Sequence, residues 1–180
     1  MMTYEELDAC RESMLAEFEN EESQPSPYRG KGLSDHGKSA FAGLMRGGIK
    51  DGNESTLAAA LNITYYWNPE EEYVRNDVAR MRRVNVPQAA QRLALTEFST
   101  WYVRGLAKRL LDQGATKCQV YRGEQPKWEP GECAEHEGII VSVQSVYDGH
   151  RAKYWPKPGR SEVFSIPFGP SCHHVIRRVV

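Results

Sequence analysis

Two short clusters of sulfur and nitrogen donors lie in the last third of the chain. They are Cys133-Ala134-Glu135-His136 and Cys172-His173-His174. A Cys and a His separated by two residues can meet one metal ion from a tight turn. Cys172 and His174 can do so from an extended segment, because alternate side chains point to the same face. The set Cys133, His136, Cys172 and His174 therefore predicts one closed tetrahedral zinc site.

Three alternatives to this closed site remain open. His173 can serve as the fourth ligand in place of His174. The clusters can also be ordinary residues, with Cys133 a surface or half-buried thiol and the His pair part of a polar tail. A zinc-dependent hydrolase or nuclease would use Glu135 or Glu137 as a base beside an open zinc position. Because four protein ligands close the site and the spacing marks no oxyanion donor, a structural zinc is favoured over an enzyme.

A run of cations interleaved with aromatic rings follows the first cluster, from residue 147 to residue 156. Its candidate contact residues are Tyr147, His150, Arg151, Tyr154 and Trp155. Such side chains can stack on exposed bases. Trp, Tyr and Arg also carry much of the binding energy of protein interfaces. No wider basic patch accompanies the run, so it predicts a contact with another protein.

Residues 32–39, GLSDHGKS, match the P-loop pattern, in which glycine amides cradle phosphates and a Lys reaches the terminal one. A working P-loop follows a buried apolar strand, whereas residues 24–31 here, QPSPYRGK, are polar and rich in Pro and Gly. The segment therefore predicts a linker that ends at the start of a helix, with nucleotide binding as the alternative.

A second alternative function is DNA binding through a helix-turn-helix. Residues 56–64 have the pattern of a first helix and turn, and basic residues follow at Arg75, Arg80, Arg82 and Arg83. Acidic residues share this segment, at Glu70, Glu71, Glu72 and Asp77. Residues 65–69, YYWNP, also interrupt it where a recognition helix would begin. A solvated charged face is therefore favoured, and any contact with DNA would be local.

Composition sets limits on these choices. The chain has 180 residues, 40% of them hydrophobic and 26% charged, which fits one core with an appended helical arm. It carries 23 Lys and Arg against 24 Asp and Glu, so its net charge of -1 gives no general attraction to nucleic acid or to an anionic membrane. No apolar run approaches the roughly 18 residues of a membrane-spanning helix, and no signal peptide is visible. We expect a cytoplasmic protein without a membrane partner.

Three regions must position the candidate residues. Residues 1–36 predict an acidic amphipathic helix, Tyr4–Glu19, and a flexible linker. Residues 37–116 predict a helical region, with short helices at Lys38–Met45 and Thr56–Leu61, another that Pro69 opens, and a long one from Pro87 to a Gly114 stop.

Residues 117–180 predict a small β-rich region that binds zinc at its strand ends. The expected strands are Lys117–Tyr121, Gly138–Gln144 and Val163–Ile166. The chain thus predicts an α+β fold, with a mostly helical first half, one long central helix and a small antiparallel β part stapled by zinc.

The order of motifs from Arg92 to Arg178 provides a family resemblance. It consists of Arg92-Leu93-Ala94-Leu95-Thr96-Glu97 on the long helix, Gly114, a short strand, residues 133–138 (CAEHEG) and residues 167–174 (PFGPSCHH). This order resembles the C-terminal domain of the phage Mu protein F-like minor head protein family. There, an Arg-Thr-Glu helix precedes a Cys pair near a Gly, and a proline-led segment ends in His and Cys residues.

The departures from that pattern lie at three points. Leu95 interrupts the triplet, His136 stands where a second Cys is common, and the last cluster is Cys-His-His. The resemblance implies a head-morphogenesis or minor capsid protein that is made in the cytoplasm and incorporated into the virion. It would act by binding other virion, portal or capsid proteins in an oligomeric assembly.

Overall fold

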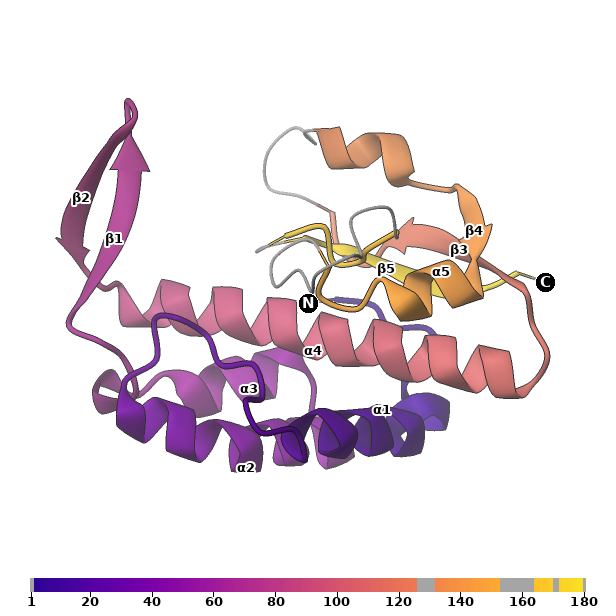
Figure 1. Ribbon diagram of the computed structural model, residues 1–180, viewed down its shortest axis with the longest axis horizontal. Coiled ribbons are helices and arrows are strands. Elements are labelled where there is room, and N and C mark those ends of the chain that lie inside the picture. Colours follow the sequence, from indigo (N-terminus) through magenta and orange to yellow (C-terminus); the bar gives the residue numbers. More distant parts are fainter. Residues whose placement is uncertain (1, 126–131, 153–163, 170–171, 180) are drawn as a thin grey trace.

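The computed structural model describes residues 2–125, 132–152, 164–169 and 172–179, with only the backbone at Glu132 and Cys133. One long helix, α4 (Val86–Asp112), crosses the middle of this part of the chain. Helices α1 (Leu7–Glu22), α2 (Asp35–Asp51) and α3 (Glu54–Leu61) lie on one side of it (Figure 1). A three-stranded sheet and helix α5 (Val143–Asp148) lie on the other. The α+β fold class predicted from the sequence is confirmed.

The middle of helix α4 is buried on all sides, which places this helix at the centre of the fold. Every residue from 96 to 103 is buried, and residues on opposite sides of the helix contact opposite layers. Asn85 caps the first turn by accepting a hydrogen bond from the Gln88 N–H, and Pro87 occupies that turn. The chain leaves the helix at Gly114, whose φ of 77° favours glycine. The predicted long helix is therefore confirmed.

Helices α2 and α3 begin at side-chain caps. Ser34 accepts a hydrogen bond from the Gly37 N–H at the start of α2, and Asn53 forms a capping box with Thr56 at the start of α3. Helix α2 continues through Gly47 and Gly48, beyond the predicted end at Met45. Gly48 packs against α3: a Cβ built on it would lie 3.6 Å from the Leu57 Cβ, an ordinary van der Waals contact.

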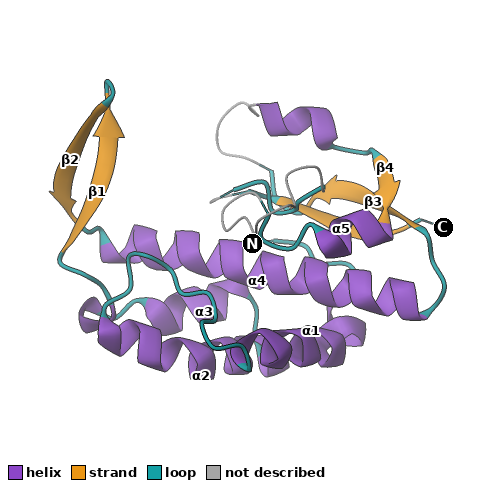
Figure 2. Ribbon diagram, in the orientation of Figure 1, coloured by secondary structure: helices purple, strands orange, loops and turns teal. Residues whose placement is uncertain are grey.

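The segment that Pro69 opens is a β-hairpin, so the helix predicted there is wrong. Strands β1 (Glu70–Arg75) and β2 (Val78–Arg83) pair antiparallel. Asn76 and Asp77 form the two-residue turn with φ values of 53° and 58°, the conformation that a tight hairpin requires. Figure 2 shows the hairpin standing away from the other elements near the start of α4.

The sheet on the other side of α4 has the strand order β4-β3-β5, with both neighbours antiparallel to the central strand. Strand β3 (Lys117–Arg122) matches its prediction. Strand β4 (Ile140–Ser142) is shorter than predicted, because Ser142 caps α5 by accepting a hydrogen bond from the Ser145 N–H. The third strand is β5 (His174–Arg178), while residues 164–166 of the strand predicted at Val163–Ile166 form no strand; Val163 lies outside the described residues.

Candidate metal centre and the ion-pair network beside it

Three of the four predicted zinc ligands can be followed in the structure. His136 ends the short 3-10 helix η2 (Glu132–His136), and Cys172 and His174 lie at the start of β5. His174 is fully buried and Cys172 is 7% exposed. The side chain of Cys133, which also belongs to η2, lies outside the described part of the structure.

Cys172 and His174 point their donor atoms toward one another. The Cys172 Sγ lies 3.8 Å from the His174 Nδ1 and accepts a hydrogen bond from the His174 backbone N–H at 3.4 Å. Two ligands of one tetrahedral zinc, with usual Zn–S and Zn–N bonds, lie about 3.6 Å apart. The spacing of these two atoms therefore fits a shared zinc ion.

The two imidazoles also carry buried nitrogen atoms that lack a hydrogen-bond partner among the described residues. These are the Nδ1 of His136 and the Nε2 of His174. Both rings contact Phe168, with ring centroids 4.3 and 6.1 Å from it. Buried polar atoms are nearly always paired in folded proteins, so the His136 Nδ1 points to a missing partner, whereas the orphan Nε2 of His174 lies across its ring from the Nδ1 that faces Cys172.

The electrostatic surroundings favour the form of histidine that binds metals. Burial, followed by the charge of Arg122, lowers the pKa of His174, so its imidazole is neutral at neutral pH. Glu137 lies beside it, with its Oε2 4.0 Å from the His174 Nε2 and 2.9 Å from the Arg122 Nε. A carboxylate in that position can orient a histidine ligand from behind.

The backbone around His136 is tied to the central strand. Gly138, with φ of 82°, donates its N–H to the Val120 carbonyl at 2.9 Å, and the Val120 N–H donates to the Ile139 carbonyl at 2.9 Å. These bonds fix η2 beside β3. The described side chains contain no group of three or more residues placed to hold a metal ion, so zinc binding stays a prediction.

The predicted interaction residues Tyr147, His150 and Arg151 are engaged inside the molecule. The Arg151 side chain is 2% exposed and donates to both oxygens of Glu97 at 2.9 and 2.8 Å. It also donates to Glu21 at 3.0 and 3.2 Å. These bonds join α1, α4 and the end of α5. Tyr154 and Trp155 lie outside the described residues.

The same network fixes two protonation states. Burial opposes ionisation of Glu21, but the His150 hydrogen bond and the Arg151 charge outweigh it and lower the pKa of Glu21 to about 2. Burial lowers the pKa of His150 to about 4, against the opposing hydrogen bond with Glu21. At neutral pH, His150 is therefore neutral, with its Nε2 3.0 Å from the Glu21 carboxylate.

A second, Arg-anchored cluster continues this network toward α5. The Arg104 Nε donates to Glu17 at 2.7 Å, and its guanidinium carbon lies 3.5 Å from the centroid of the Tyr147 ring. The Tyr147 hydroxyl donates to Glu17 at 3.0 Å. Glu17, Glu21, Glu97 and Arg104 were not predicted as site residues, because their partners lie between 54 and 130 positions away in the chain and local spacing carries no signal of them.

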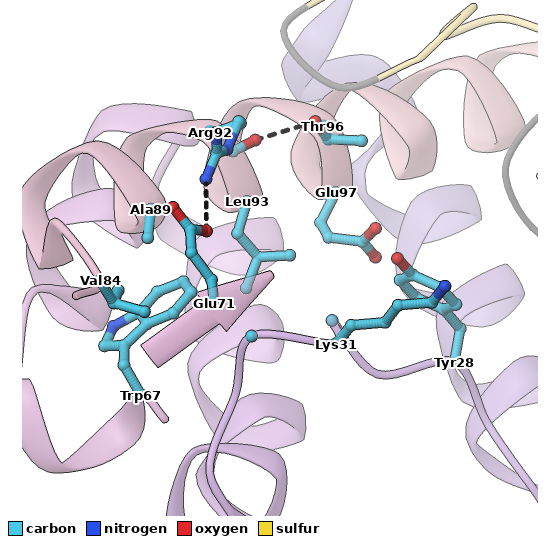
Figure 3. Close-up of a pocket in the computed structure, with 12 residues that line it drawn as sticks. Tyr28, Lys31, Trp67, Glu71, Val84, Ala89, Arg92, Leu93, Thr96 and Glu97 are labelled. Atoms are coloured by element: carbon cyan, nitrogen blue, oxygen red, sulfur yellow. Dashed lines mark hydrogen bonds and ion pairs between the residues drawn. The ribbon is translucent and has the colours of Figure 1, made fainter. Parts of the chain in front are cut away.

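A pocket of about 320 Å³ lies at the base of the hairpin, between β1, α4 and the linker before α2 (Figure 3). Trp67 and Leu93 form much of its apolar wall, and Glu71 and Lys31 supply charges. Figure 3 shows Glu71 turned toward Arg92 of α4, 3.3 Å away. The pocket can accept an apolar side chain with a polar neighbour.

The two nucleotide-related motifs lack the surroundings that they need. In the P-loop pattern, Ser34 caps α2 and Lys38 pairs with Asp35, and Leu33 forms only an isolated bridge with Trp67 instead of ending a strand. Helix α3 is followed by η1 (Thr64–Tyr66) and the hairpin, so no second helix enters a helix-turn-helix there.

Comparison of this chain with protein-family models, with curated proteins and with solved structures found no match. Among the described residues, no helix combines the length and the apolar character needed to cross a membrane. The resemblance of residues 92–178 to phage head proteins stays a prediction.

Proposed function

We propose that this protein is a structural component of a phage virion or prohead that acts by contacts with other virion, portal or capsid proteins. The resemblance of residues 92–178 suggests the class of assembly. The observation that carries a binding role is the hairpin, which exposes Val74, Val78 and Met81 by 68, 51 and 59%. An isolated two-stranded hairpin is marginal in water, and apolar side chains on a projecting arm are typical of a surface that a partner covers.

The test of this proposal is the location of the protein in particles. Virions and proheads would be purified by density gradient from cells that produce the chain, and their proteins quantified by mass spectrometry. We expect the chain at a constant ratio to the major capsid protein in successive fractions. A chain found only in the soluble fraction, while capsids are abundant, would contradict the proposal.

Zinc is the second part of the proposed function. Bound by Cys133, His136, Cys172 and His174, it would cross-link η2 to the start of β5. Such a cross-link supports a small sheet: β4 pairs with β3 over only three residue pairs, which leaves little core to hold that end. In this role the metal stabilises a binding scaffold and takes part in no turnover.

Elemental mass spectrometry of the purified chain tests the zinc site. We expect about one zinc per chain, lost in Cys172→Ser, because a hydroxyl is a poor zinc ligand. Cys118→Ser is the matched control, since Cys118 is another buried thiol, on β3, whose pKa burial raises to about 12. Zinc retained in Cys172→Ser, or absent from the parent, would remove the metal from the proposal.

A further inference from the structure

The outer edges of the hairpin carry backbone groups that no third described strand pairs with. The Val84 N–H donates to the Pro69 carbonyl, and in an antiparallel pair the mutually bonded positions recur every second residue. The groups that point outward therefore belong to Glu70, Glu72 and Val74 on β1, and to Ala79, Met81 and Arg83 on β2. Exposed edges of this kind are templates for another strand.

The hairpin of a second copy fits such an edge in only one direction. Hairpins that point the same way in one sheet would repeat every 10 Å or so, the width of two strands. The body behind each hairpin is far wider, since α4 alone, with 27 residues, is about 40 Å long. Hairpins that point in opposite directions put the two bodies at opposite ends and avoid this clash.

The charges on the two strands then determine whether β1 or β2 pairs with its counterpart in the second copy. In a two-fold pairing of β2 with itself, the outward groups must face one another. Registers centred on residues 80 to 83 set an Arg opposite another Arg, and the register centred on Ala79 pairs only residues 78–80. Strand β1 carries both signs, because Glu71 lies near its base and Arg75 at its tip. Two antiparallel copies of β1 can therefore place each Glu71 beside the Arg75 of the other copy.

We propose that two copies of this chain pair through β1 and form a four-stranded sheet, β2-β1-β1-β2, with its two-fold axis at Tyr73. In this register Glu72 and Val74 of the two copies exchange backbone hydrogen bonds, and Glu71 meets Arg75 twice. It is an isologous interface, the commonest kind among homo-oligomers. This inference deepens the proposed role in protein contacts and rests on it only for the use of the hairpin as a contact arm.

The pocket at the hairpin base supports this geometry. Pairing Glu71 with Arg75 brings the turn of the second copy, Asn76-Asp77, to the body where Glu71 lines the pocket. Lys31 also lines the pocket, with its side chain directed toward Tyr28 (Figure 3). The apolar wall made by Trp67 and Leu93 offers a place to the exposed Val78. Each arm would thus bridge to the body of its partner.

Cysteine cross-linking tests the register. Tyr73→Cys puts two thiols directly opposite, where facing Cβ atoms lie about 4.5–5.5 Å apart, close to the range of a disulfide. We expect a covalent dimer under mild oxidation. Arg80→Cys is the matched control, because it lies opposite Tyr73 within the hairpin but on the other edge, and neither it nor the parent should form a covalent dimer. Equal cross-linking of both variants, or ladders beyond the dimer, would overturn the proposal.

Sedimentation equilibrium of the full chain tests the contact without a cross-link. We expect a concentration-dependent dimer whose dissociation constant rises at least tenfold in Arg75→Glu, which sets Glu against Glu71, and changes less than twofold in Arg80→Glu. Circular dichroism melting checks that each body stays folded. A parent that is monomeric at every concentration contradicts the dimer. It leaves the proposed function standing if the chain is still found in particles, so the two failures are distinguishable.

Discussion

Arg151 forms ion pairs with glutamates of two different helices, Glu21 of α1 and Glu97 of α4. It is 2% exposed and pairs with Glu97, which is fully buried, and with Glu21. Arg151→Met would leave Glu97 as an uncompensated charge in the core and should lower the free energy of unfolding by about 3–5 kcal/mol. Urea unfolding measures this. The control is Arg46→Met, whose partner Glu19 is 44% exposed, and which should cost less than about 1 kcal/mol. Equal losses in both variants would contradict the assigned role.

His150 makes stability depend on pH. Its pKa is about 4 when folded and 6.5 in its ordinary state, so the unfolded chain binds the proton more readily. Stability is therefore complete above pH 6.5 and falls as the pH drops toward 4; the lowered pKa of Glu21 adds a further loss between about 4.5 and 2. Urea unfolding between pH 7 and 4 should show the decline. His150→Gln, which keeps a donor for Glu21, should flatten it, and an unchanged slope would assign the titration to other groups such as His173 and His174.

For individual residues, the sequence predicts contacts between side chains that are close together in the chain. Cys172 and His174 were paired from their spacing of two, and their donor atoms do face one another. The Glu97–Arg151 pair spans 54 positions, and nothing in the sequence around either residue marks the other. Arg151 was consequently assigned to a surface contact, whereas it lies in the core.

The packing of α1 against α4 depends on one small residue. A Cβ on Gly105 would lie 2.6 Å from the Met14 backbone nitrogen, a distance that no real contact shows. Gly105→Ala should therefore separate the two helices and destabilise the fold by several kcal/mol. Gly47→Ala on α2, where a Cβ meets no atom within 4 Å, should instead stabilise by about 0.5–1 kcal/mol. Thermal melting of both variants compares them, and a shift of the same sign in both would contradict this packing.

Elements with a strong helical or strand pattern were predicted, and those with competing signals were not. Helix α4 agrees with the sequence because apolar residues recur at helical intervals, and strand β3 agrees because buried Cys118 and Val120 alternate with more exposed residues. At Pro69, three Glu residues suggested a first helical turn, and they outweighed the turn signal of Asn76-Asp77. Strand β5 was not predicted: the extended segment expected at Cys172 and His174 was treated as a pair of ligands, and the third strand was placed at Val163–Ile166.

The arrangement of the whole molecule follows from α4 having two buried sides. A helix that is buried all round must have a layer on each side, and the chain supplies helices before it and a sheet after it. The sequence predicted this division into a helical and a β-rich part. The sequence did not predict that α1 packs directly on α4. That contact joins residues such as Glu17 and Arg104, which are 87 positions apart in the chain.

That long-range contact has a consequence for the order of folding during synthesis. The apolar face of α1 leaves the ribosome before its binding surface on α4, which is translated some 87 residues later, and Glu5 can meet Arg177 only after a further 172 residues have been added. A chain made at about 5–20 residues per second exposes this face for several seconds. Contacts so distant also make folding slow once the chain is complete. The nascent chain thus carries an unburied apolar helix face for as long as α4 is still to be made.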